Sequence, residues 1–300
     1  MNKCNEELSR FVAMSGVLLS SNAIDVDGES RLVLIGTDQG VVEALAFGGR
    51  QLMQAFEQPL DAWALRLVYG NGSEQLPALV GLEADPYTDG LTLLPEAVCP
   101  VDGVVADIRA LVACIQTPPL QAFVKKVLLR RDVFAKFWVM PASAKHHHAR
   151  AGGLALHSLE VASDLAGHRG LTGVELDLGV AGALLHDIGK VWSYTSDMFL
   201  NAAGLAMGHE LVGLSRIEPE LTHLEGIWPD GAYTMRAVLS GQARMRENGS
   251  LPTSLLARIK ACDQRSCERD RAVSRVHRAS IPAWVPRAWK DPYRVEEVVF

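Results

Sequence analysis

Hydrophobic positions in the first hundred residues fall into short segments that are separated by turn-forming residues. Alternating or continuous apolar runs of this length, bounded by glycine, asparagine and aspartate, are typical of β-strands. The pattern predicts strands over Phe11–Leu19, Arg31–Thr37, Val41–Phe47, Ala64–Tyr69 and Leu76–Glu83. A short helix is predicted over Arg50–Phe56, between the third strand and the fourth.

This order of elements resembles a small Greek-key barrel of the oligonucleotide/oligosaccharide-binding type. The resemblance is one of pattern, and it predicts an OB-like domain over residues 1–97. Barrels of this kind often bind single-stranded nucleic acid through basic grooves and stacking aromatic residues. Residues 1–100, however, carry 5 Lys+Arg against 14 Asp+Glu, a balance of −9. A barrel that contacts a protein partner or mediates dimerisation is therefore an equal alternative.

Beyond residue 100 the apolar positions change to the helical period of three to four residues. Helices are predicted over Leu154–Gly167, Leu176–Ile188, Met207–Arg216, Tyr233–Arg246 and Pro252–Val276. Several glycines and prolines, among them Pro219 and Pro229, are interpreted as breaks between these helices. The predicted fold class is α+β, with an all-helical domain over residues 98–280 and an irregular tail over 281–300.

Composition adds little beyond excluding some classes of protein. Apolar residues make up 48% of the 300-residue chain and charged residues 21%, which is typical of a globular protein. No apolar stretch is long enough to span a bilayer, and the first residues lack the apolar segment of a secretion signal. The five scattered cysteines suggest neither a disulfide framework nor a zinc ribbon. We therefore expect a cytoplasmic protein with reduced thiols and no membrane partner.

The charge balance favours a polyanion as partner of the second part of the chain. Residues 101–300 hold 24 Lys+Arg against 21 Asp+Glu, a balance of +3, within a net charge of −6. Basic residues gather in local runs there, including Lys125-Lys126 and Arg130-Arg131. We expect a nucleic acid or a nucleotide to bind this part of the chain.

The strongest chemical signal lies in four residues that helical spacing directs to one place. His186 and Asp187 are followed by Gly189, so they stand where a helix ends and neighbouring side chains can converge. His157 lies on the predicted buried stripe of its helix. Asp263 shares a helix face with two apolar residues, and a buried carboxylate there needs a partner or a metal. Imidazole and carboxylate ligands together suit Mn, Fe, Zn, Ni or Mg.

The order His157, His186-Asp187, Asp263 resembles the signature of the HD-domain superfamily of metal-dependent phosphohydrolases, which has an all-helical fold. The segment His186-Asp187-Ile188-Gly189-Lys190 is one of its more specific forms. Within that superfamily, the block 141–162 is similar to YhaM-type 3′-5′ exoribonucleases, which carry a nucleic-acid-binding barrel before the HD domain. The triple histidine 146–148 and the motif that begins at Asp263 resemble the HD domain of relaxases from integrative conjugative elements.

The resemblance implies roles for individual residues. It makes His157, His186, Asp187 and Asp263 the metal ligands, with His209 as an auxiliary ligand. Asp187 and Lys190 are the expected catalytic residues, the first steering a water and the second meeting a phosphate oxygen. The expected substrate contacts are His147, His148, Arg150, Lys190 and Arg265.

One departure from the family pattern bears on the number of metal ions. Relatives with two metals tend to carry a histidine pair where this chain has Ser240-Gly241-Gln242. The sequence therefore predicts one cation site and argues against a complete second one, unless His223 or one of the histidines 146–148 substitutes.

The predicted function is metal-dependent hydrolysis of a phosphate ester, with a phosphodiester in nucleic acid as the leading substrate and small nucleotides as a further one. A first alternative is a relaxase-like DNA-processing module of a conjugative element, which would need a nucleophile such as Tyr194 or Tyr233. A second alternative is a metal-stabilised binding protein without turnover.

Overall fold

The computed structural model describes residues 10–24, 30–47, 49–70, 75–171, 173–242 and 251–272. The chain divides into two compact units. The first comprises Met1–Pro95 together with Leu129–Arg131, and the second comprises Glu96–Leu128 and Asp132–Phe300. The predicted tail 281–300 lies outside the described residues. Among the described residues, no helix has the length and apolar character needed to cross a membrane.

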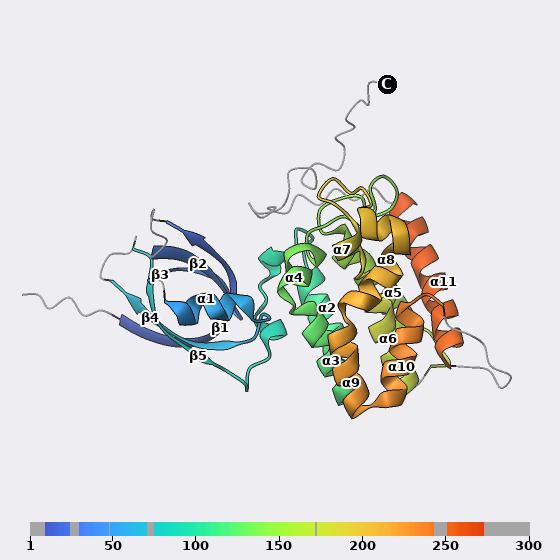
Figure 1. Cartoon of the computed structure of the whole chain (residues 1–300), viewed down its shortest axis with the longest axis horizontal. Coiled ribbons are helices and arrows are strands. Elements are labelled where there is room, and N and C mark those ends of the chain that lie inside the picture. The colour runs from blue at the N-terminus through green and yellow to red at the C-terminus, as the bar shows by residue number, and fades with distance from the viewer. Residues whose placement is uncertain are drawn as a thin grey trace, which may run out of the picture. The chain divides into compact units, whose positions relative to one another are not determined.

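The described strands of the first unit form a closed barrel in the order β1-β2-β3-β5-β4 (Figure 1). They are β1 Arg10–Ala23, β2 Ser30–Thr37, β3 Gly40–Phe47, β4 Trp63–Tyr69 and β5 Ala78–Ala84, with helix α1 Arg50–Glu57 between β3 and β4. Each lies where the hydrophobic pattern predicted it. Neighbouring strands are antiparallel except for β3 and β5, which are parallel.

Strand β1 closes the barrel because it pairs with two strands along its length. Its first half, Arg10–Gly16, pairs with β4, and Val17–Ala23 pairs with β2. The change of partner occurs at Gly16, where an added Cβ would lie 2.6 Å from Ile35 and 2.8 Å from Leu65. A residue without a side chain is therefore needed where the strands converge. Alternate strand residues and two residues of α1 fill the interior: Leu18, Val33, Ile35, Ala44, Ala46, Leu52, Ala55, Leu65, Leu67 and Leu82.

The second unit is helical in its described residues (Figure 1). A short 3₁₀ turn at Glu96–Val98 begins this unit, and another at Gly90–Leu93 precedes it in the first unit. The helices are α2 Val104–Ala113, α3 Pro118–Leu128, α4 Arg131–Phe137, α5 Gly153–Ala166, α6 Val174–Leu185, α7 Lys190–Ser193, α8 Ala202–Arg216, α9 Glu218–Ile227, α10 Pro229–Leu239 and α11 Leu251–Ala272.

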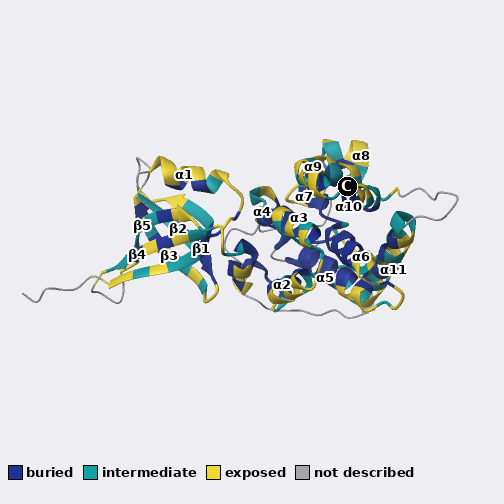
Figure 2. Cartoon of the chain, turned by 90° about the horizontal axis from the view of Figure 1, so that it is seen from below, coloured by how far each residue is buried: buried dark blue, intermediate teal, exposed yellow. Residues whose placement is uncertain are grey.

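Helices α5 and α6 pack against each other at the centre of the helical unit. Helix α5 also contacts α2 and α11, whereas α6 contacts α3, α10 and α11. All residues of α6 from Asp177 to Leu185 are buried, as the dark blue of this helix in Figure 2 shows. Its Gly179 and Gly182 face Leu165 and Val238 so closely that a Cβ would come within 2.8 Å of each. This central pair provides the fixed frame on which the candidate site is built.

Helix α9 was not predicted, and the predicted start of α10 was wrong. Proline occupies the first turn of both helices. A proline in the first turn loses no hydrogen bond, because the amide groups there have no partner within the helix. Pro219 and Pro229 therefore begin helices instead of separating them. Helix α8 begins at Ala202, five residues before the predicted Met207, and contains a non-helical residue at Gly208.

Candidate metal centre

His157 is held at the centre of the helical unit by the start of α5. Gly152 has a left-handed backbone conformation with φ of 76°, and a Cβ on Gly153 would collide with the carbonyl oxygen of His148. The glycine pair thus allows the chain to turn sharply into the helix. His157 lies one turn inside α5 on its buried face and has no exposed surface. The prediction that His157 lies on the buried stripe is confirmed.

His186 and Asp187 lie in the turn that joins α6 to α7, as the position of Gly189 predicted. The Nδ1 of His186 donates a hydrogen bond to the carbonyl oxygen of Ala183 at 2.7 Å. Asp187 is only 4% exposed. Because the helix ends here, the two neighbouring side chains point to a common region instead of diverging.

The structure brings His157, His186, Asp187 and Asp263 together. The Nε2 of His157 lies 3.2 Å from the Oδ1 of Asp263 and 3.5 Å from the Oδ2 of Asp187. The Nε2 of His186 lies 3.5 Å from the same Oδ2. Asp263 flanks the buried face of α11 with its side chain 39% exposed. Ligand atoms of His157, His186 and Asp187 thus lie within 4.8 Å of one another, and Asp263 lies beside His157 on the side of α11.

Hydrogen bonds at the Nδ1 atoms of His157 and His186 leave the Nε2 atom of each ring with a free lone pair. The hydroxyl of Ser266 donates to Glu160 at 2.7 Å, so its oxygen accepts from the Nδ1 of His157 at 3.0 Å. The Nδ1 of His186 is the donor to Ala183 in the same way. Among the described residues, neither Nε2 has a hydrogen-bond partner, although both are buried.

This arrangement of atoms fits a bound cation. Two nitrogen lone pairs face carboxylate oxygens at about hydrogen-bond distance, with no proton assigned between them. Such groups repel one another in a buried site unless a positive charge lies between them. Imidazole and carboxylate are a ligand set that divalent metals accept, and a metal-bound histidine typically makes a hydrogen bond through its other ring nitrogen, as His157 does with Ser266.

The electrostatics of the cluster keep its carboxylates ionised. Burial opposes ionisation of Asp187, but the charge of Lys190 outweighs it and holds the pKa of Asp187 well below the usual value. Burial likewise opposes ionisation of Asp263, yet when no cation is bound a proton on the facing imidazoles of His157 and His186 lowers the pKa of Asp263 to about 2. Burial lowers the pKa of His157, which favours the neutral imidazole that metal binding needs.

His209 is positioned by a close approach between α8 and the turn that carries Asp187. A Cβ on Gly189 would collide with the backbone of His209 and would also meet Gly213 of α8. The Nε2 of His209 lies 3.0 Å from the Oδ1 of Asp187. The structure therefore brings His209 to the cluster as a partner of Asp187.

Lys190, which was expected to meet a phosphate oxygen, has two partners within the protein. Lys190 is 8% exposed, and its Nζ lies 2.7 Å from the Oδ2 of Asp187 and 2.8 Å from the carbonyl oxygen of Ala142. Burial would lower the pKa of Lys190, but Asp187 outweighs it and raises the pKa above its usual value. Lys190 lies one turn after Asp187, so its charge reaches that carboxylate and stabilises it.

His148, which was also expected to contact substrate, has no exposed surface. Its Nε2 lies 3.1 Å from Glu160, and its backbone amide donates to the carboxylate of Asp270. His147, by contrast, is half-buried, and its ring centroid lies 5.1 Å from that of His157. Burial lowers the pKa of His147 to about 4, so its imidazole is neutral at pH 7.

Two arginines that we expected to contact substrate have protein partners instead. Arg150 donates to Asp270 at 2.9 Å. Arg265 donates to Asp164 at 2.7 Å and lies 2.7 Å from the Nε2 of His168. Since Arg265 follows Asp263 by two residues, it points about 200° away around the helix. Neither guanidinium belongs to the cluster.

Sequence analysis missed two residues near the cluster, Glu160 and Cys267. Glu160 lies one turn after His157 on α5, and Cys267 lies one turn after Asp263 on α11. Spacing of three or four residues from each predicted ligand was the signal that could have found them.

The model of the family described as the HD domain matches residues 154–264. The matched segment contains His157, His186, Asp187, His209 and Asp263. Comparison with curated proteins and with solved structures gave no match to the chain. Residues 154–264 are therefore an HD domain, and domains of this superfamily are in general metal-dependent phosphohydrolases that bind divalent cations.

Proposed function

We propose that this protein hydrolyses a phosphate ester with the aid of a divalent cation held by His157, His186, Asp187 and Asp263. The observation that carries the proposal is the pair of buried Nε2 atoms, each without a hydrogen-bond partner among the described residues, that face two carboxylates. The HD-domain match over these residues supports it independently.

When bound, the cation would lower the pKa of a coordinated water from 15.7 toward about 7 and polarise the phosphoryl group. The residues of the chain hold this centre in a fixed geometry. Ser266 and the carbonyl oxygen of Ala183 fix the two imidazole rings through Nδ1. Lys190 holds Oδ2 of Asp187, and His209 holds Oδ1. Asp187 is thus oriented from both oxygens, so that it can position a water for attack.

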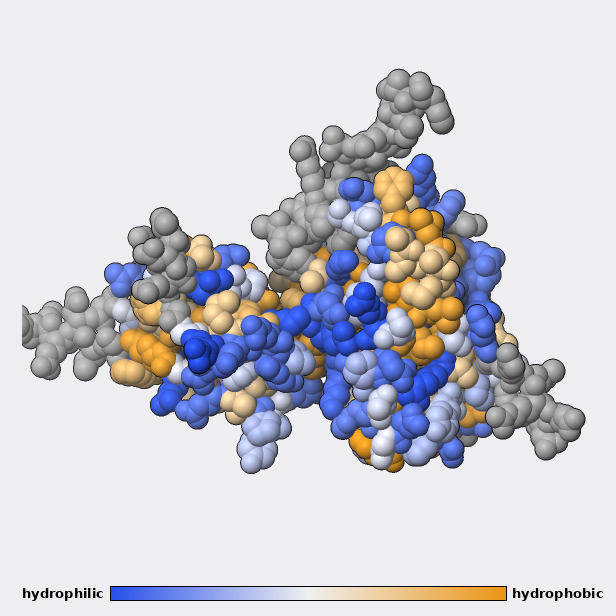
Figure 3. Space-filling view, in the orientation of Figure 1, coloured by the Kyte–Doolittle hydropathy of each residue, from blue (hydrophilic) through white to orange (hydrophobic). Residues whose placement is uncertain are grey.

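A phosphodiester in nucleic acid is the substrate that we favour. Beside His209, the start of α8 and the preceding loop expose apolar side chains, with Phe199 and Leu205 each 72% exposed and Met207 47% exposed. Figure 3 shows hydrophobic side chains gathered over α8. Bases stack on exposed apolar and aromatic surfaces, whereas a simple phosphate ester would gain nothing from them.

The barrel supports the same substrate class by its topology. Its strand order, the parallel pairing of β3 with β5 and the helix between β3 and β4 support the interpretation as an OB-like barrel. Two aromatic residues on its strands, Phe11 and Phe47, are 74% and 68% exposed. Since the balance of charge in this segment is −9, we propose that the barrel contacts either unpaired bases or a protein partner, with no role in neutralising phosphates.

The proposal is tested by turnover with Mn²⁺ on a chromogenic phosphodiester and on a labelled single-stranded oligonucleotide. Asp187→Ala and His186→Ala should abolish hydrolysis of both substrates. His223→Ala is the matched control, because His223 is an exposed histidine of α9. Phe199→Ala should raise KM for the oligonucleotide and leave hydrolysis of the chromogenic substrate unchanged.

Hydrolysis that survives Asp187→Ala would contradict the proposed mechanism. A protein that binds the cation but turns over neither substrate would support the metal-stabilised binding protein instead. Covalent attachment of the oligonucleotide to the protein would point to relaxase-like chemistry.

A further inference from the structure

Glu160 lies on α5 one turn after His157, and one of its oxygens meets two hydrogen-bond donors. The hydroxyl of Ser266 donates to Oε2 of Glu160 at 2.7 Å, and the Nε2 of His148 lies 3.1 Å from the same oxygen. Burial opposes ionisation of Glu160, but the hydrogen bonds from His148 and Ser266 outweigh burial and lower the pKa of Glu160 below its usual value. Because an ionised carboxylate can only accept, the hydrogen of the His148 ring stands on Nε2.

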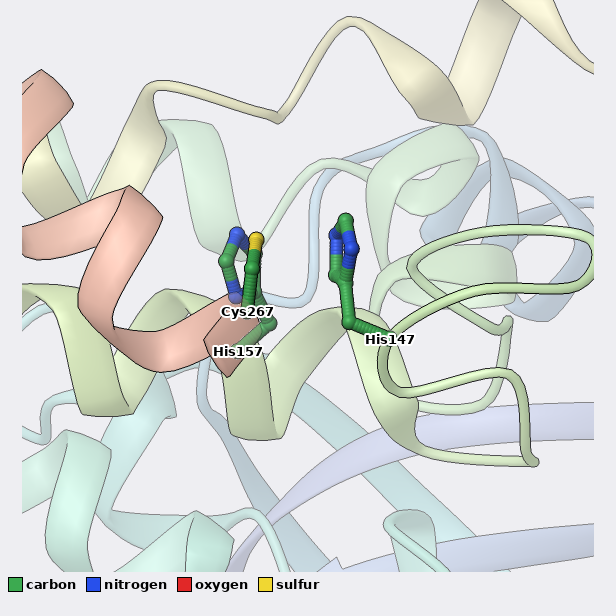
Figure 4. Close-up of side chains that lie close together, drawn as sticks. All are labelled: His147, His157 and Cys267. Carbon is green, nitrogen blue, oxygen red and sulfur yellow. The ribbon is translucent and has the colours of Figure 1, made fainter. Parts of the chain in front are cut away.

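The bond to Glu160 determines which way the hydroxyl of Ser266 points. A hydroxyl has a single hydrogen to donate, and that of Ser266 is directed at Glu160. The oxygen of Ser266 therefore accepts from the Nδ1 of His157, 3.0 Å away, and the hydrogen of that neutral ring stands on Nδ1. Figure 4 shows the ring of His157 beside Cys267 of α11, the residue that follows Ser266. The Nε2 of His157 is thereby left with the lone pair that a cation needs.

His148 reaches Glu160 from a strained backbone conformation. Its φ of 48° lies in the left-handed region, which residues with a side chain rarely adopt. Its Nδ1 is buried without a hydrogen-bond partner among the described residues. Both features destabilise the fold, yet the amide of His148 is held by Asp270 and its carbonyl oxygen accepts from the amide of Ala142 at 3.1 Å. A strained residue with an unpaired buried nitrogen points to a role for the one bond that its ring makes, which is the bond to Glu160.

We propose that Glu160 is a positioning residue that fixes the tautomer of His157 through Ser266. His148 holds the carboxylate of Glu160 from the other side. Without Glu160, the hydroxyl of Ser266 would be free to turn and donate to the Nδ1 of His157. The ring would then lose its hydrogen from Nδ1 to solvent and gain one at Nε2, where it blocks the position of the cation. Only this consequence for cation binding rests on the proposed function, because the tautomer is a property of the metal-free protein.

Three substitutions separate the hydrogen bonds of Glu160 from its charge. Glu160→Ala removes both the charge and the acceptor. Glu160→Gln removes the charge but keeps an oxygen that can accept both bonds, because the two donors meet at one oxygen. Asp164→Asn is the matched control, since it removes one carboxylate charge from the next turn of α5. Asp164 pairs with Arg265 at 2.7 Å and has no part in the bonds of Ser266.

The first measurement is nitrogen NMR of the full chain, labelled in its histidines, freed of metal with a chelator and held at a pH where the rings are neutral. Couplings between the ring nitrogens and the carbon-bound ring hydrogens distinguish a hydrogen on Nδ1 from one on Nε2. His157→Gln assigns the signals of His157. We expect the hydrogen of His157 on Nδ1 in the wild-type protein, Glu160→Gln and Asp164→Asn. In Glu160→Ala we expect a shift of the population toward the tautomer with the hydrogen on Nε2.

The second measurement is calorimetric titration of the same variants with Zn²⁺. Loss of an outer partner of a metal-bound histidine weakens metal affinity about 10–100-fold. Because Glu160 acts through Ser266, we expect Glu160→Ala to weaken binding about tenfold, at the lower end of that range. Glu160→Gln and Asp164→Asn should bind as the wild type does. Glu160→Ala should cause no further loss in Ser266→Ala, since the residue through which it acts is already gone.

The outcomes separate this inference from the proposed function. A hydrogen on Nε2 of His157 in the metal-free wild-type protein would overturn the inference, and so would a tautomer that is unchanged in Glu160→Ala. Equal losses of affinity in Glu160→Gln and Glu160→Ala would also overturn it, because the charge and not the hydrogen bonds would then be responsible. A wild-type protein that shows the expected tautomer but binds no Zn²⁺ would overturn the proposed function and leave the role of Glu160 in place. Circular dichroism of each variant checks that the helical unit is folded.

Discussion

Ser266→Ala removes one hydroxyl group whose only expected task is to orient the imidazole of His157. Ser266 is 2% exposed on α11, and its oxygen lies between the Nδ1 of His157 and the carboxylate of Glu160. Alanine fits the same space without new contacts. The change leaves the Nδ1 hydrogen of a fully buried ring without its acceptor, whereas Glu160 still receives a bond from His148.

The size of the effect follows from this single lost partner. A buried donor that loses its acceptor costs about 1–3 kcal/mol. Part of that cost destabilises the tautomer of His157 with the hydrogen at Nδ1. This is the tautomer that presents the lone pair of Nε2 to the cation. Loss of an outer partner of a metal-bound histidine lowers metal affinity about 10–100-fold, which corresponds to about 1.4–2.7 kcal/mol. The two ranges agree.

The assay is calorimetric titration of the wild-type protein, Ser266→Ala and Ser158→Ala with Zn²⁺. Ser158 is the matched control because it follows His157 on α5, is fully buried, and has a hydroxyl without a hydrogen-bond partner among the described residues. We expect Ser158→Ala to bind as the wild type does and Ser266→Ala to bind 10–100-fold more weakly. Equal affinities of the two variants would refute the assigned role of Ser266.

Three further predictions concern the frame of the site. Gly189→Ala should displace His209 from Asp187, because the added methyl group collides with the backbone of His209; hydrolysis should fall at least tenfold, and unchanged kcat would contradict this. Removing the cation with a chelator should lower Tm, because the buried carboxylates and the Nε2 lone pairs would then face one another without a positive charge between them. Identical melting curves with and without the chelator would argue against a bound ion. Burial opposes ionisation of Asp270, but the His148 amide and Arg150 outweigh burial and lower its pKa. The ionised carboxylate of Asp270 therefore stabilises the fold above about pH 4, and this contribution is lost as the pH falls through the lowered pKa. Asp270→Asn should therefore reduce the free energy of unfolding at pH 7 more than at pH 3, as urea titration can measure.

The positions of the proposed ligands could be predicted because local periodicity determines where each side chain points. His157 follows the apolar stripe of α5, and Gly189 marks the helix end that turns His186 and Asp187 toward each other. Asp263 follows the apolar positions of α11, although it lies at the edge of the buried stripe of Leu255, Ile259, Cys262 and Ser266. Local spacing cannot distinguish the centre of a stripe from its edge.

The partners of the charged residues could not be predicted, because these partners lie far away in the sequence. Lys190 is buried by a bond to Ala142, which lies 48 residues earlier. Arg265 pairs with Asp164, 101 residues earlier. A basic residue beside a motif has the same sequence signature whether it meets substrate or a carboxylate of the protein.

The barrel and the helices illustrate the same limit. Strand positions followed from alternation, but the closure of the barrel depends on β1 pairing with both β2 and β4. Helix α9 was missed because proline has opposite effects in the first turn and in the interior of a helix. The sequence shows the proline without showing which of these positions it occupies.

The central claim is that side chains from α5, the α6–α7 turn and α11 hold one cation. The most direct test is an anomalous difference map from crystals of the protein grown with Zn²⁺ or Co²⁺. We expect a peak within coordination distance of the Nε2 atoms of His157 and His186 and of carboxylate oxygens of Asp187 and Asp263. A peak at Asp164, His168 and Cys262 instead, or no peak at all in the helical unit, would contradict it.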